Sequence, residues 1–135
     1  MIVHHSDLSG TGQVEPYVIL ACNDSSIKVI DDSGRLLSQC VLDAAPTCIT
    51  LVQEAAEAQR PTILLFGLQN GNIGAVELQA DELIVLWELD ASYEGPKAPV
   101  SHIKVAQLKD NQPPSCILVR EDSTIEIYKF MPRQG

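Results

Sequence analysis

Short apolar segments separated by polar turns run along the whole chain. The segments are rich in Ile, Val and Leu, and they either alternate with polar residues or run apolar throughout. Polar clusters separate them, as at residues 23–26, 69–72 and 121–124. Short strands joined by regular turns produce this pattern. The sequence therefore predicts an all-β fold.

One stretch of good helix formers interrupts the strand pattern. Residues 52–59 include three alanines and two glutamates but carry no apolar stripe, and Arg60-Pro61 ends the stretch. We expect a loop with at most one helical turn at this place, between two strands.

A repeated unit is the strongest pattern in the sequence. Each copy has a proline, an apolar strand, a polar turn and an alternating strand, and therefore reads as a β-hairpin. The first strand is apolar on both faces, which predicts burial inside a stack of sheets, whereas the second is typical of a half-exposed strand. The three copies cover residues 16–30, 61–76 and 114–128.

Further strands flank these hairpins. One strand precedes each hairpin, and an outer strand follows each of the first two; they lie at residues 2–5, 48–52, 102–108, 35–42 and 83–89. The unit is thus four strands in about 45 residues, which is the strand count and period of a β-propeller blade. We expect residues 1–135 to form a partial propeller, with blades at about 1–43, 45–91 and 99–130, the last without its outer strand.

The number of blades has a consequence for assembly. A closed propeller needs at least about four blades, so we expect the chain either to be part of a larger propeller or to complete its ring with a partner. Blade faces left open also predict that the isolated chain associates with itself.

Charge narrows the classes of function. Nine Lys and Arg against 18 Asp and Glu give a net charge of −9, which argues against nucleic acid and against direct docking on anionic membranes. No apolar run approaches the roughly 20 residues of a membrane-spanning helix, and we expect no signal peptide. Hydrophobic residues make up 45% of the chain, so a packed core is expected.

The cysteines favour a structural role. None forms a CxxC pair, and each lies among apolar neighbours, which is typical of small buried thiols in a reducing compartment. A disulfide framework is a weaker alternative, and a zinc site is weaker still because His4, His5 and His102 lack metal-site spacing. The four are Cys22, Cys40, Cys48 and Cys116.

Residues 7–15 resemble the calcium loop of FG-GAP-type propeller blades, in which alternating carboxylates wrap a hard cation. Ser9 and Thr11 stand where that loop carries carboxylates, so only Asp7 and Glu15 bring charge. We interpret the loop as a turn, with calcium binding as the alternative.

No residue pattern predicts catalysis. The sequence contains no Gly-x-Ser-x-Gly motif and no phosphate-binding glycine loop. His4 and His5 are neighbours on a predicted strand and point to opposite faces, so they do not readily share a metal ion, and Asp31-Asp32 fits a hairpin turn. We therefore assign no catalytic, cofactor-binding or metal-binding residue, and expect no enzyme activity and no cofactor. Trp87, on an outer strand, is predicted to pack between blades, with an interface anchor as the alternative.

An ordered set of motifs extends over about 110 residues of the chain. The set comprises residues 18–24, 27–30, 45–47, 64–67, 70–71, 86–89, 116–122 and 125–128. In this order the motifs resemble those of the N-terminal β-propellers of BBSome subunits. The resemblance implies a seven-bladed propeller in the full protein, followed by further domains.

The resemblance also implies a function. It implies a non-enzymatic scaffold in a coat-like adaptor that carries membrane proteins into and out of cilia and is recruited to membranes by a small Arf-like GTPase. The implied partners are other subunits and membrane-protein cargo, with only indirect membrane contact, and the implied location is the cytoplasm, the cilium and the ciliary base. Two alternatives stay open: another trafficking or intraflagellar-transport adaptor, and a degenerate FG-GAP calcium module. The lack of Gly-His and Trp-Asp dipeptides argues against a WD-type propeller.

Overall fold

The computed structural model describes residues 2–6, 15–52, 62–79, 82–89, 97–106 and 115–129. The regular structure of these residues is β-strand throughout. The first four strands are β1 (Ile2–Ser6), β2 (Glu15–Cys22), β3 (Ser26–Asp31) and β4 (Leu36–Val41). The next four are β5 (Pro46–Leu51), β6 (Thr62–Leu68), β7 (Ile73–Leu78) and β8 (Leu83–Leu89). The last three are β9 (Val100–Ala106), β10 (Ser115–Arg120) and β11 (Ile125–Lys129).

These strands form three small antiparallel sheets in sequence order. The first sheet contains β1 to β4, the second β5 to β8, and the third β9 to β11. Within each sheet, strands that are consecutive in the chain pair with one another, as expected for the blades of a propeller. The predicted all-β class is confirmed, and the three hairpins read from the sequence are β2–β3, β6–β7 and β10–β11.

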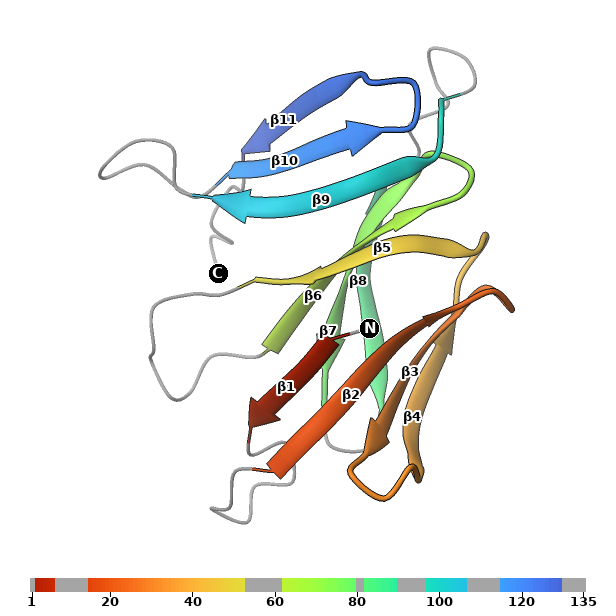
Figure 1. Cartoon of the computed structure of the whole chain (residues 1–135), viewed down its shortest axis with the longest axis vertical. Coiled ribbons are helices and arrows are strands. Elements are labelled where there is room, and N and C mark those ends of the chain that lie inside the picture. The colour runs from red at the N-terminus through yellow and green to blue at the C-terminus, as the bar shows by residue number, and fades with distance from the viewer. Residues whose placement is uncertain are drawn as a thin grey trace.

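The sheets are stacked face to face, with the second sheet in the middle (Figure 1). One core cluster lies between the first and second sheets and contains Ile19, Ile27, Leu64 and Phe66. A second cluster lies between the second and third sheets and contains Leu65, Val100 and Leu118 among others. The middle sheet contributes to both clusters because its successive side chains point to opposite faces.

The burial of the hairpin strands differs from the prediction at one place. β6 is buried along most of its length, as expected for the first strand of a hairpin. β7 was expected to be half-exposed, and this is wrong: every residue of β7 except Glu77 is buried. The reason is that β7 belongs to the middle sheet, so neighbouring sheets cover both of its faces.

Gly74 in β7 permits a close approach across the middle sheet. A Cβ atom at this position would lie 2.3 Å from Phe66 Cζ and 2.7 Å from the backbone oxygen of Trp87. The fully buried Phe66 ring therefore occupies the space that a side chain at residue 74 would need. Glycine is required here for packing, because the ring covers the backbone directly.

The turns of the three hairpins share one backbone geometry. Ser25, Gly71 and Ser123 hold the same place in the three turns and have φ values of 67°, 89° and 68°. In the second and third hairpins the N–H of this residue donates to the carbonyl three residues earlier, from Gly71 to Leu68 and from Ser123 to Arg120. This arrangement is a tight turn followed by a left-handed residue, a common short hairpin connection.

Two of these turns use a non-glycine residue in the left-handed region, which costs free energy for any side chain with a Cβ. Ser25→Gly and Ser123→Gly are each expected to raise the free energy of unfolding by about 0.5–1 kcal/mol, measured by urea denaturation. Thr124→Gly is the matched control, because Thr124 lies in the same turn with an ordinary φ, and this change should destabilise the chain. Loss of stability in both serine variants would contradict the expectation.

Several predicted features lie outside the described residues. The helix-forming stretch falls almost wholly within residues 53–61, and most of the calcium-like loop falls within residues 7–14. In the part of the chain that is described, no helix is long and apolar enough to cross a membrane.

Candidate interaction surface

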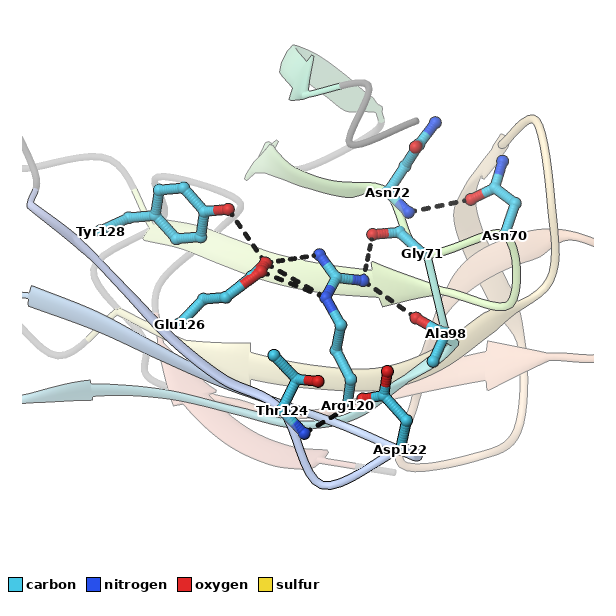
Figure 2. Close-up of polar contacts among 9 residues, drawn as sticks. All are labelled: Asn70, Gly71, Asn72, Ala98, Arg120, Asp122, Thr124, Glu126 and Tyr128. Atoms are coloured by element: carbon cyan, nitrogen blue, oxygen red, sulfur yellow. Dashed lines mark hydrogen bonds and ion pairs between the residues drawn. The ribbon is translucent and has the colours of Figure 1, made fainter. Parts of the chain in front are cut away.

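Arg120, the last residue of β10, is a buried charge at the junction of the second and third sheets. Only 2% of the residue is exposed, and its guanidinium lies at the centre of a group of polar contacts (Figure 2). Nη2 donates to Oε1 of Glu126 at 2.9 Å, and Nε donates to the same carboxylate. Nη1 donates to the backbone oxygens of Gly71 at 2.8 Å and Ala98 at 2.9 Å.

This group of contacts joins three segments of the chain. Gly71 lies in the β6–β7 turn, Ala98 precedes β9, and Glu126 lies on β11. The Tyr128 hydroxyl adds a hydrogen bond to Glu126 Oε1 at 3.1 Å. The guanidinium of Arg120 lowers the pKa of the Glu126 carboxyl, because an adjacent positive charge favours the ionised form. Through these hydrogen bonds the buried Arg120 and the partly exposed Glu126 form a structural junction between the second and third sheets.

Sequence reasoning missed Arg120. The residue ends an apolar strand and is followed by Glu121-Asp122, so it reads as part of a charged turn. The repeat could have indicated it, because the corresponding strands of the first two hairpins end in the apolar residues Cys22 and Leu68. A charge at a position that is otherwise apolar in a repeat indicates a special contact there.

Exposed apolar side chains lie on the outer strands and on the last strand. They are Leu36, Val41, Val85, Trp87, Leu89, Ile125 and Ile127. The face of the sheet on which each side chain lies follows from its partner on the neighbouring strand, because residues directly opposite each other in a sheet share a face. The candidate interaction surface is the part of this set that lies on β8 and β11 and faces away from the first sheet, namely Trp87, Leu89, Ile125 and Ile127.

On β11, Ile125 and Ile127 are 65% and 57% exposed. Counted from the left-handed turn residue, they correspond to Ile73 and Ala75 on β7, which are 2% and 1% exposed. In the middle sheet these positions are covered by the third sheet. In the third sheet the corresponding face is open among the described residues.

On β8, Trp87 and Leu89 are 42% and 38% exposed. They lie opposite Ala75 and Ile73, and therefore on the face that the third sheet covers. Trp87 lies on an outer strand, as predicted, but the packing expected of it between blades is incomplete. The face that carries Trp87 and Leu89 is covered near β6 and β7 and only partly covered along β8.

The cysteines are free thiols, and only Cys116 is fully buried as predicted. Cys22, Cys40 and Cys48 are half-buried, so the prediction of burial is wrong for these three. Burial, together with the nearby Cys48 thiol, raises the pKa of Cys116 to about 11. The buried thiol therefore stays protonated at neutral pH and is a weak nucleophile.

Cys116 is expected to resist alkylation. At pH 8 iodoacetamide should modify this thiol far more slowly in the folded chain than in urea, as read by peptide mass spectrometry. The folded thiol keeps its proton to higher pH than an unfolded thiol, so stability should fall as the pH rises from about 9 towards 11. Equal alkylation rates in folded and unfolded chain would contradict this.

The other residues singled out in the sequence have structural places. His4 and His5 lie on β1, opposite Tyr17 and Pro16. The carboxylate of Asp31 accepts hydrogen bonds from the backbone N–H groups of Ser33 and Arg35, both at 2.9 Å, and so organises the β3–β4 turn. These bonds, with one from the Ser33 hydroxyl, lower the pKa of Asp31. Within the described ranges, no three His, Cys, Asp or Glu side chains cluster as metal ligands would.

Comparison with known proteins assigns these features to a family. A family model described as "BBS7 beta-propeller" matches residues 1–134. The chain belongs to the BBS7 β-propeller family. The resemblance to BBSome propellers, and among them to the seventh Bardet–Biedl syndrome protein, is thereby confirmed.

A curated relative agrees with the BBS7 family. The chain is 28% identical over 117 residues to "BBSome complex member bbs-7" of Caenorhabditis elegans. The match covers 87% of this chain and 16% of that relative, so the chain spans about a sixth of the relative's length.

Solved structures agree with the propeller fold of the BBS7 family. Two are crystal structures of BBS1N in complex with ARL6DN. The lead-soaked crystal gives a TM-score of 0.60 at 16% identity, over 88% of this chain and 33% of that chain. The mercury-soaked crystal gives 0.65 at 13% identity, over 98% of this chain and 35% of that chain. At these identities the likeness shows the fold alone.

Proposed function

We propose that the chain is a non-enzymatic interaction scaffold, part of the propeller of a BBSome-type subunit in an adaptor that traffics membrane proteins to and from cilia. The observation that carries this proposal is the BBS7 family match over residues 1–134. The relative's description as a BBSome complex member supports assembly with other subunits. The BBS1N structures with ARL6DN support proteins as the class of partner.

The chain would supply three consecutive blades of a larger ring, at about residues 1–43, 45–91 and 99–130. The strands of the first, second and third sheets lie inside these ranges, which supports the division. The open face around Ile125 and Ile127 supports a further blade or another chain against the third sheet.

The proposed partners are other BBSome-type subunits and membrane-protein cargo, in the cytoplasm, the cilium and the ciliary base. Membrane contact would be indirect, and nucleic acid is not a partner. The net charge of −9 supports both statements. Two of the positive charges, those of Lys28 and Arg120, are already paired with carboxylates of the chain. This pairing also supports indirect membrane contact and the lack of a nucleic-acid partner.

The calcium alternative has a simple test. If residues 7–15 held calcium, adding the ion would raise the melting temperature, because a ligand that binds only the folded chain stabilises it. We expect the melting temperature to be the same with added calcium, with added magnesium and with neither ion. A large rise with calcium alone would favour the FG-GAP module.

The scaffold proposal is tested by affinity purification of the tagged chain from ciliated cells, read by mass spectrometry. Enrichment of BBSome subunits is expected. Ile127→Glu should reduce this enrichment, because it places a charge on the open apolar face, whereas Asn23→Glu, in the exposed β2–β3 turn, should retain it. Enrichment of intraflagellar-transport proteins without BBSome subunits would contradict the proposal in favour of the other adaptor.

A further inference from the structure

The β6–β7 turn contains the one Asn-Gly pair of the sequence, Asn70-Gly71. Asn70 is exposed to solvent, whereas Gly71 is buried where the second and third sheets meet. In such a pair the backbone nitrogen of the glycine can attack the side-chain carbonyl carbon of the asparagine, because glycine has no Cβ to obstruct the approach. A reactive pair thus lies at the junction of two sheets.

The folded turn keeps the two reacting groups apart (Figure 2). The N–H of Gly71, which has to lose its proton for the attack, donates to the backbone oxygen of Leu68 at 3.0 Å. The side-chain oxygen of Asn70 accepts from the backbone N–H of Asn72 at 3.0 Å, which fixes the carboxamide. A reaction between the two groups has to break both hydrogen bonds. The turn is therefore protected while it keeps its folded geometry.

The contact between the sheets holds Gly71 in this position. Its carbonyl oxygen accepts from Nη1 of the buried Arg120 at 2.8 Å. A Cβ atom at residue 71 would lie 2.7 Å from Cβ of Lys97, so the chain before β9 also packs closely on the turn. Arg120 is itself held by Glu126 of β11 at 2.9 Å. We therefore expect the turn to open only when the third sheet moves away from it.

We propose that Asn70 is a site of spontaneous deamidation that reacts only when the contact between the second and third sheets opens. The backbone nitrogen of Gly71 gives up its proton and bonds to Cγ of Asn70, and the Cγ–Nδ2 bond breaks as ammonia leaves with that proton. One water molecule then opens the resulting succinimide ring at either carbonyl carbon, which gives aspartate or isoaspartate without any redox change. The new carboxylate is a lasting record of the time that the contact has spent open.

The other two hairpin turns show which product the fold accepts. The residues at the place of Asn70 in those turns are the aspartates Asp24 and Asp122. Asp122 Oδ1 accepts from the backbone N–H of Thr124 at 3.0 Å, which is the bond that Asn70 Oδ1 makes in its own turn. The aspartate product therefore fits. The isoaspartate product adds a methylene group to the main chain of the turn, which displaces the carbonyl group that Arg120 binds.

The proposal is tested by measuring deamidation of the full chain at pH 8 with peptide mass spectrometry. Electron-transfer fragmentation separates aspartate from isoaspartate. In guanidinium chloride, where the turn is always open, residue 70 is expected to react more than about tenfold faster than in the folded chain. Arg120→Lys keeps the charge but loses the planar fork, and should raise the rate in the folded chain about tenfold. Circular dichroism shows that each variant keeps its β-structure before rates are compared.

Three control variants separate the junction from general instability. Val29→Ala weakens the core between the first and second sheets, and should leave the rate at residue 70 close to that of wild type. Asn70→Gln should show no deamidation at this position, because its longer side chain disfavours ring closure. Asn70→Asp should keep the denaturation midpoint of wild type, and a large loss would contradict the fit of the aspartate product.

Three results would overturn the proposal. Equal rates in the folded chain and in guanidinium chloride would show that the turn is not protected. Equal acceleration by Val29→Ala and Arg120→Lys would show that the reaction follows unfolding of the whole chain. No reaction in guanidinium chloride would show that the pair is unreactive. The readout is the chemistry of one turn, so it stands or falls independently of copurification with BBSome subunits.

Discussion

Replacing Arg120 with alanine is expected to lower the free energy of unfolding by about 3–5 kcal/mol. The change removes the charge that pairs with Glu126 and the donors to the backbone oxygens of Gly71 and Ala98. Groups left without partners at a buried junction bear the full cost of desolvation. Because small domains are stable by only about 5–15 kcal/mol, urea denaturation should show a large loss.

Two variants test whether the guanidinium geometry is responsible. Arg120→Lys keeps the positive charge but loses the planar fork, so its stability should fall between those of wild type and Arg120→Ala. Lys28→Ala removes the ion pair with Asp24, whose side chain is 60% exposed, and should change stability little. If Arg120→Ala were as stable as Lys28→Ala, the junction would have no structural importance.

Phe66→Ala is expected to lower the free energy of unfolding by about 3–5 kcal/mol. Phe66 is fully buried in the cluster between the first and second sheets, and its ring covers Gly74. Truncation would leave a cavity where two sheets meet and would expose the backbone of β7. Thermal unfolding followed by circular dichroism measures the loss.

A double-mutant cycle tests the contact between the ring and the glycine. Gly74→Ala should destabilise the wild-type chain, because the new Cβ would lie 2.3 Å from Phe66 Cζ. In a Phe66→Leu background the same change should cost less, although the backbone oxygen of Trp87 still restricts the site. Equal costs in both backgrounds would show that the two residues are not coupled.

Much of the fold was predictable because strand and turn signals are local. Residues 16–30, 61–76 and 114–128 form the predicted hairpins, since each joins two apolar segments through a polar turn. The outer strands followed from the repeat of these units, and the family resemblance followed from the ordered set of motifs. Burial was predicted less well, because it depends on which sheets lie on either side. β7 has a neighbouring sheet on both faces, whereas β11 has a neighbouring sheet on one face among the described residues.

The candidate surface required the structure. Trp87 was identified on an outer strand, but its exposure depends on the third sheet, whose residues lie after it in the chain. Arg120 was missed because its partners Gly71 and Ala98 are distant in sequence. The left-handed conformation of Ser25 and Ser123 was not predicted, because glycine is the usual residue in that conformation. Of the three equivalent turn positions, only residue 71 is a glycine.

The central claim is that the apolar residues exposed on β8 and β11 are interface positions of a propeller scaffold. Amide hydrogen exchange measures this directly, because pairing and burial both slow exchange. Exchange is compared between the isolated chain and the chain within the assembly with which it copurifies. The peptides that report on the claim cover residues 83–89 and 125–129. The account predicts slower exchange of both in the assembly, with the buried β6 unchanged. Unchanged exchange of β8 and β11 in the assembly would contradict it.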